Sequence, residues 1–226
     1  MSQQGVASRH SSGISRDEQF LVLANELCTL LKVEGVTCRA ALPGLPYFSK
    51  LHDDKKAEII EHLQFYLELC DSQIAEGYRI KDSLTFTWRA LKKLNLVPPS
   101  DMFSYVTDQD VIEIYDGEGR QLYRNFRFFE CCSYSLEELY SVEWWNLFDR
   151  DLKITQGLFS IVDKVFAGEL KNIVDAQVES HPVIEKISEQ KLEILYEKAF
   201  IGPLFRDKKA EAVVAIVRGR VLNQLG

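Results

Sequence analysis

The sequence predicts an α+β protein in which an all-helical N-terminal region precedes an antiparallel sheet with helices across one face. Apolar residues recur at three- and four-residue steps in the first part of the chain and alternate with a strand period in the later part. Pro98 and Pro99 lie between the two patterns, and consecutive prolines stop a helix. We therefore expect a boundary at 95–101.

The N-terminal region begins with a polar stretch that lacks the apolar segment of a signal peptide. We expect residues 1–16 to be a disordered tail and residues 17–97 to be a helical region for dimerisation or partner docking. Ser15 and Glu18 match the capping box that starts a helix. The apolar stripe of this first helix supplies the candidate dimer contacts, which are Phe20, Leu23, Leu27, Leu30 and Leu31.

Two further helices are predicted before the prolines. Asp53 or Asp54 is expected to cap the second helix, because a carboxylate at this position accepts hydrogen bonds from free backbone N–H groups. The third helix is predicted from an apolar stripe of its own, which consists of Leu84, Trp88, Leu91 and Leu94.

The second region, at 101–223, opens with a hairpin signal. Segments rich in β-forming residues at 110–116 and 120–124 flank the turn Asp-Gly-Glu-Gly. Two more strands are predicted near the end of the chain, at 191–205 and 211–221. Because strands joined by tight turns pair antiparallel, these segments are expected to form one antiparallel sheet.

Between these strands the sequence predicts helices. Ser135 and Glu138 form a second capping box, which predicts a helix from near Leu136. A longer helix is predicted at 154–170 from the spacing of its apolar residues. This middle section must cross one face of the sheet to bury its aromatic residues.

Three segments in this region carry a resemblance to a known family. The first is EIYDGEGRQLYRN, a hairpin that ends at Asn125. The second is FFECCSYSLEELYSVEWWNLFDRD, in which Ser-Leu-Glu-Glu-Leu follows Tyr134 and a tryptophan pair precedes Asp149. The third is IGPLFRDKKAEAVVAIVRG, in which Pro-Leu precedes a charged turn and an apolar strand. Taken together, at about 105–222, they resemble the PAS domain family.

The resemblance implies a non-catalytic sensory or interaction module in signal transduction, which passes its output through dimerisation or a partner protein. It also implies that a small molecule can bind in the core between sheet and helices, where Trp and Tyr combine apolar area with a polar group. A filled core and a partner surface are the alternative interpretations of the aromatic stretch. The ligand-pocket candidates are Asn125, Phe128, Phe129, Tyr134, Trp144, Trp145, Phe148, Leu158 and Val162.

No catalytic constellation indicates an enzyme, since the sequence has no Ser-His-Asp order, P-loop or HExxH motif. A small α+β enzyme that uses the same cavity stays the alternative, and a charged residue at an inward strand position would indicate it. The strand carboxylates Glu113 and Glu193 are both expected to point outward between apolar neighbours. Glu137 and Glu138 are expected to serve in helix capping.

The composition argues against several classes of binding partner. A net charge of −7 argues against nucleic-acid binding, and no apolar run approaches the roughly 20 residues that span a membrane. The five cysteines and four histidines show no metal-ligand spacing, so reduced thiols and no metal are expected. His181 lies past the helix that carries the haem ligand in some PAS proteins, and no cofactor is predicted. We expect a cytoplasmic homodimer that contacts a downstream signalling protein.

Overall fold

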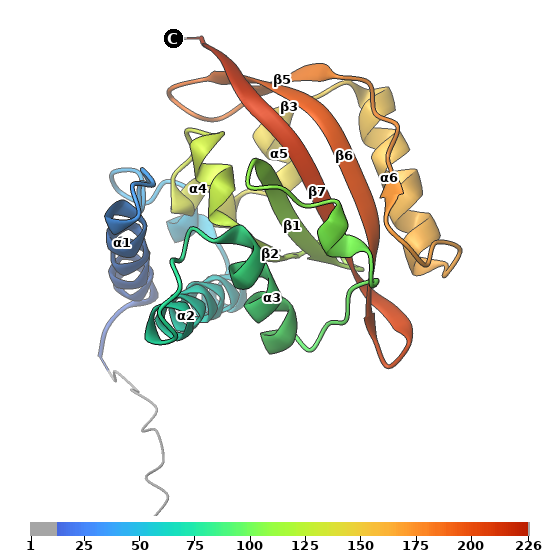
Figure 1. Cartoon of the computed structure of the whole chain (residues 1–226). Coiled ribbons are helices and arrows are strands. Elements are labelled where there is room, and N and C mark those ends of the chain that lie inside the picture. The colour runs from blue at the N-terminus through green and yellow to red at the C-terminus, as the bar shows by residue number, and fades with distance from the viewer. Residues whose placement is uncertain (1–12, 226) are drawn as a thin grey trace, which may run out of the picture.

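The computed structural model describes residues 13–225 and contains helices on both sides of one curled antiparallel sheet (Figure 1). The residues predicted as a disordered tail lie mostly outside the described residues. The helices of three or more turns are α1 (Arg16–Val33), α2 (Asp53–Ala75), α3 (Ser83–Lys93) and α6 (Leu152–Phe166). The short ones are η1 (Phe48–Lys50), η2 (Met102–Ser104), η3 (Phe126–Glu130), α4 (Leu136–Ser141) and α5 (Trp144–Leu147).

The sheet has the strand order β2-β1-β7-β6-β5-β3, and β4 also pairs with β6. All of its pairs are antiparallel. The longest strands form one hairpin whose turn has positive φ angles at Asp207 and Lys208, as two-residue hairpin turns require. The strands are β1 (Asp110–Asp116), β2 (Gln121–Arg124), β3 (Phe148–Asp149), β4 (Val174–Asp175), β5 (His181–Glu185), β6 (Leu192–Arg206) and β7 (Lys209–Gln224).

The α+β class and the antiparallel sheet are confirmed, and the four predicted strands correspond to β1, β2, β6 and β7. Three short strands were not predicted. β5 contains Pro182, which cannot donate to a ladder, and it pairs with β3 only at Ile184 and Glu185. The helix predicted at 154–170 ends earlier, at Phe166, because Gly168 takes a positive φ just beyond the helix.

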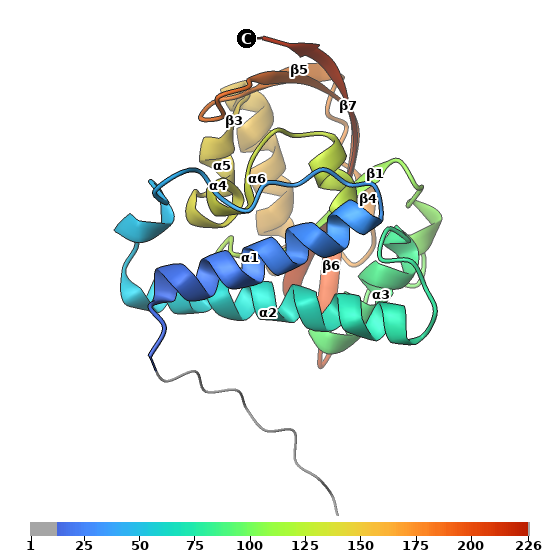
Figure 2. The same cartoon turned by 90° about the vertical axis from the view of Figure 1, so that its left-hand side faces the viewer.

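The helices α1 and α2 lie side by side, as Figure 2 shows, and pack through the stripe that was predicted to face a second chain. Phe20, Leu27 and Leu31 have no exposed area, and Leu23 and Leu30 are partly buried against the same core. The ring of Phe20 stacks on Phe48 at 4.3 Å between centroids. A second chain therefore cannot reach the three buried side chains while α1 is in this position.

The caps and the buried face of the next two helices differ from the expectation. His52, rather than an aspartate, occupies the N-cap of α2, and Asp53 and Asp54 lie in its first turn. In α3 the buried face is rotated relative to the predicted stripe: Leu84 is 39% and Trp88 53% exposed. The buried residues of α3 are Ser83, Phe86, Thr87, Ala90 and Leu91.

This rotation of α3 has a visible cause in its contacts with the sheet. Phe86 packs on the rings of Phe126 and Tyr123, at 4.8 and 6.1 Å between centroids. Thr87 Oγ1 lies 3.0 Å from the Tyr123 hydroxyl, so a polar side chain is satisfied inside the core. These contacts bury the face of α3 that carries Phe86 and Thr87 and leave Leu84 partly exposed.

The N-terminal helices cover the face of the sheet opposite to α6 (Figure 1). Ile112 and Ile114 of β1 and Val214 and Ile216 of β7 belong to the same buried cluster as the apolar residues of α1, α2 and α3. The sheet is thus buried on both faces, and the helical region shares a core with it. None of the described helices is both long and apolar enough to cross a membrane.

Side chains of α2 close the free edge of the sheet at β2. The Tyr66 hydroxyl donates to the carbonyl of Arg124 at 2.8 Å and accepts from the N–H of the same residue. His62 Nε2 lies 3.1 Å from the carbonyl of Leu122, to which it must donate because a carbonyl only accepts. An edge strand otherwise exposes these groups for pairing with another chain.

We expect Tyr66→Phe to lower the free energy of unfolding by about 1–3 kcal/mol, because it leaves a buried N–H and a buried carbonyl of Arg124 without a partner. Urea titration measures this loss. Tyr78→Phe is the matched control, since Tyr78 is 49% exposed. Equal stabilities of the two variants would show that the hydroxyl does not hold the edge.

The burial of His62 predicts an acid-sensitive stability. Burial lowers the pKa of His62 to about 4, against the opposing effect of its bond to Leu122. The folded state therefore excludes a proton that the unfolded chain binds below about pH 6.5. Stability is full above this pH and falls by up to about 3 kcal/mol as the pH drops to about 4. Over that range His62→Gln should show a flatter stability profile than wild type and than His52→Gln, an exposed control.

Candidate functional site

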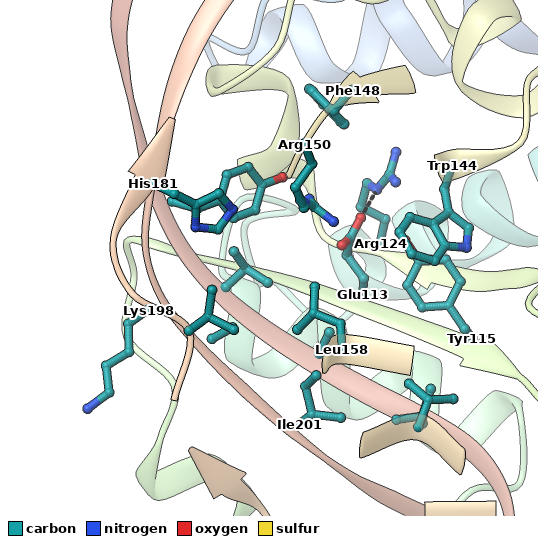
Figure 3. A pocket seen from close by; sticks show the side chains of 17 residues that line it. Glu113, Tyr115, Arg124, Trp144, Phe148, Arg150, Leu158, His181, Lys198 and Ile201 are labelled. Atoms are coloured by element: carbon teal, nitrogen blue, oxygen red, sulfur yellow. Dashed lines mark hydrogen bonds and ion pairs between the residues drawn. The ribbon is translucent and has the colours of Figure 1, made fainter. Parts of the chain in front are cut away.

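A cavity of about 100 Å³ lies between the sheet and α6, on the face away from the N-terminal helices (Figure 3). Every strand of the sheet except β4 contributes to its wall. Its lining residues are Glu113, Tyr115, Arg124, Trp144, Phe148, Arg150, Leu158, Val162, Val178, His181, Tyr196, Lys198, Ala199, Ile201, Val213, Ala215 and Val217.

Strand alternation determines which residues of β1 reach this cavity. Ile112 and Ile114 face the N-terminal helices, so Glu113 and Tyr115 face the opposite side. The expectation that Glu113 points outward is therefore wrong, because the helical region covers the face that was taken as solvent-exposed. Glu193, by contrast, lines neither the cavity nor the cleft described below and accepts from the amide of Asn223 at 2.6 Å.

Glu113 does not lie in the cavity as a free carboxylate. Its Oε1 accepts from Arg124 Nε at 2.7 Å, and both side chains are largely buried. The guanidinium of Arg124 also lies 3.7 Å from the ring centre of Phe128. Burial works against the charge of Arg124, but Glu113 holds its pKa above the ordinary value. The pair is thus a fixed, internally neutral part of the wall.

Arg150 and His181 also line the cavity (Figure 3). The Arg150 guanidinium lies 5.0 Å from the ring centre of Tyr196, and the His181 ring stacks on the same tyrosine at 5.9 Å. Within residues 13–225, neither Arg150 Nε nor His181 Nε2 has a hydrogen-bond partner, although both atoms are buried. Such atoms cost free energy unless something binds them.

The chemistry of these groups follows from their contacts. His181 Nδ1 lies 2.8 Å from the carbonyl of Glu179, so the proton of the neutral ring is on Nδ1 and Nε2 is an acceptor. Burial raises the pKa of Tyr196 to about 12, which keeps its hydroxyl protonated at neutral pH. Arg150 supplies a permanent cation with N–H donors.

The cavity opens into a cleft of about 630 Å³ between the β1–β2 turn, α5 and α6. Trp144 lies at the junction, with ring centroids 5.6 Å from Tyr115, 5.6 Å from Phe159 and 5.7 Å from Trp145. The cleft falls in the size range of small-molecule sites. The residues that line both spaces are Tyr115, Trp144, Phe148, Arg150, Val162 and Val213.

The ligand-pocket candidates divide into two groups. Trp144, Phe148, Leu158 and Val162 line the cavity, and Trp145 lines the cleft. The other candidates, Asn125, Phe128, Phe129 and Tyr134, line neither space.

Two of the candidates that line neither space have a clear structural role. Asn125 Oδ1 accepts from the N–H of Ile112 at 3.0 Å, and its Nδ2 donates to Ser83 Oγ at 3.1 Å, which ties β1 to α3. The hydroxyl of Tyr134 donates to the carbonyl of Leu147 and accepts from the N–H of Lys186 at 3.0 Å. Both side chains hold the wall of the cavity from behind.

Sequence reasoning missed the charged residues of the site. Arg124 and Arg150 lie within two of the segments that resemble the PAS family but were not candidates, and His181 was considered only as a haem ligand. Tyr196 lies next to a bulge of β6, between Tyr196 and Lys198, which breaks the simple alternation of side chains. The alternation of side chains in β1 could have indicated Glu113, because it places this residue on the face opposite to Ile112 and Ile114. That face belongs to the core if both faces of the sheet are buried.

Three buried carboxylates outside the cavity hold the fold together. Glu138 completes a capping box with Ser135, as predicted, but Glu137 does not cap its helix. It accepts from the N–H groups of Leu42, Tyr47 and Phe48 at 2.8 to 3.0 Å, which fixes the 42–48 loop on α4.

Glu185, the third of these carboxylates, was not considered from the sequence. It accepts from Ser133 and from the N–H of Leu192, and burial raises its pKa. These hydrogen bonds join the segment before α4 to β5 and β6, so the role of Glu185 is structural.

A scan against models of protein families found no match, and a search of curated proteins found none either. Among the described residues no group of three histidine, cysteine or acidic side chains is placed to hold a metal ion. All five cysteines are free thiols, and burial raises the pKa of Cys131 and Cys132.

The buried ion pair between Glu113 and Arg124 gives a prediction about stability. We expect Glu113→Gln to lower the free energy of unfolding by about 3–5 kcal/mol, since it leaves the buried Arg124 without its counter-charge. Glu113→Leu combined with Arg124→Leu should recover most of this loss. Asp116→Asn is the control, because its partner Arg120 is 52% exposed and such pairs contribute up to about 1 kcal/mol. Chemical denaturation separates the cases, and a Glu113 effect no larger than the control would contradict the argument.

Proposed function

We propose that this protein is a non-catalytic, PAS-like sensory or interaction module that binds a small molecule between the sheet and α6. The observation that supports it best is the cavity itself, which holds two buried polar atoms without partners, Arg150 Nε and His181 Nε2. Native proteins rarely leave such atoms unsatisfied, and a ligand would supply the missing partners.

In this proposal the module transmits its signal through protein–protein association, either as a homodimer or with a downstream signalling protein in the cytoplasm. The stripe of α1 is occupied inside the molecule, so the proposed interface has to use other surfaces. Exposed apolar side chains on the helical region are available for it, among them Trp88 and Leu84 of α3 and Ile74 of α2.

A small α+β enzyme is the second candidate, because a carboxylate does face the cavity. The ion pair with Arg124 argues against Glu113 as a general base, since a base must give up such a partner before it can take a proton. A pure scaffold is the third candidate, and it requires that nothing occupies the cavity.

The cavity can be tested by filling it. Ala215 lies between Glu113 and Ile201 in the sheet and lines the cavity, so Ala215→Leu should occupy the space a ligand needs. Native mass spectrometry and an absorption scan of the freshly purified full chain should detect a bound small molecule in wild type and none in this variant. Ala75→Leu makes the same change on an exposed helix end and should retain the ligand.

The opposite result has a clear meaning. If wild type carries no small molecule and gains none from a metabolite extract, while Ala215→Leu melts at a higher temperature than wild type, the cavity is a packing defect. The scaffold interpretation would then replace the sensor.

A further inference from the structure

We infer that the ligand is an amphipathic organic acid, whose carboxyl group binds Arg150 and His181 and whose apolar body extends past Trp144 into the cleft. This inference rests on the proposed function, because it assigns a chemical class to the occupant of the same cavity.

The balance of charge inside the cavity favours an anion. Glu113 is neutralised by Arg124 at 2.7 Å, and Lys198 pairs with Asp175 at 3.3 Å and points away from the cavity (Figure 3). Across the part of the chain that the structure describes, no carboxylate lies within ion-pairing distance of Arg150. The wall therefore has one cation in excess, and a bound carboxylate would supply its counter-charge.

The hydrogen-bonding pattern favours a carboxyl group over other anions. Arg150 Nε is a donor, and the His181 ring accepts at Nε2 in the tautomer that donates from Nδ1 to the carbonyl of Glu179. A carboxylate satisfies both atoms when binding takes up one proton from solvent: one oxygen accepts from Arg150 Nε, and the proton lies between the other oxygen and His181 Nε2. A phosphate ester carries up to two charges and needs more donors than this end of the cavity presents.

The volume and lining indicate an apolar body. The cavity of about 100 Å³ holds little beyond the acid group, whereas the adjoining cleft measures about 630 Å³. Three apolar side chains on the cleft wall are partly uncovered: Leu152 is 69%, Trp145 42% and Phe159 41% exposed. An aliphatic or aromatic body laid along them removes apolar area from water, at about 25 cal/mol per Å².

Charges at the mouth of the cleft set the direction of the ligand. Asp116, Glu118 and Asp163 lie around the cleft, and Lys186 is its one lysine. Asp116 and Glu118 both pair with Arg120, which leaves this rim without an excess cation. An acid group is thus favoured beside Arg150 and His181, with the apolar body in the cleft.

The test uses the full chain and calorimetric titration with probes of matched length: octanoate, octanol and octylamine, together with phenylpropanoate and acetate. We expect octanoate or phenylpropanoate to bind at least about tenfold more tightly than octanol, from one charged hydrogen bond, and octylamine not to bind. Acetate should bind more weakly than the longer acids, because it leaves the cleft empty.

Variants assign the effect to the two residues. Arg150→Gln and His181→Phe should each reduce the affinity for the acid about tenfold and leave the affinity for octanol unchanged. His181→Phe keeps a ring against Tyr196. Lys153→Gln removes an exposed cation of α6 that lines neither space and should have no effect.

Three results would overturn the inference. If octanol binds as tightly as the acids, the cavity is a ligand site but not for an acid, and the proposed function survives. If acetate binds as tightly as octanoate, the inference that an apolar part of the ligand occupies the cleft is wrong. If none of the probes binds and the purified chain carries no small molecule, the proposed function fails as well.

Discussion

The closure of the β2 edge by α2 is the constraint on which the rest of the structure depends. The hydroxyl of Tyr66 satisfies both backbone groups of Arg124, and His62 satisfies the carbonyl of Leu122. These bonds place α2 against the sheet, and α1 and α3 pack beside it in one core. Because the helices then cover the face that carries Ile112 and Ile114, the alternate residues of β1 must face the other side.

A sheet that is buried on both faces has no solvent side on which to place its charges. Glu113 is therefore buried, and it is stable there because Arg124, on the neighbouring strand, pairs with it directly. The same reasoning does not apply to Arg150 Nε and His181 Nε2, two buried atoms that have no hydrogen-bond partner within residues 13–225. The matched pair is therefore structural, whereas the proposed binding site rests on the unmatched atoms.

The cavity exists because α6 covers the sheet loosely. Only Val165 of this helix is buried, while Leu158 and Val162 line the cavity. Trp144 and Phe148 close the side of the space from α5 and β3, and they are held by the bonds of Tyr134 to Leu147 and Lys186. A rigid back wall and a lightly packed helix are together what a ligand-responsive site requires, because the helix can adjust to an occupant while the wall holds it.

Local signals in the sequence determined much of this architecture. The capping boxes at Ser15 and Ser135, the hairpin around Gly117 and the strands β1, β2, β6 and β7 follow from short-range chemistry that acts wherever the chain folds. Among the aromatic residues named as pocket candidates, Trp144 and Phe148 line the cavity. The direction of Glu113, the partner of the α1 stripe and the meeting of Arg150 with His181 were decided only by the tertiary structure. Each depends on which surface covers which face, and an amphipathic pattern shows that a face will be buried without specifying what buries it.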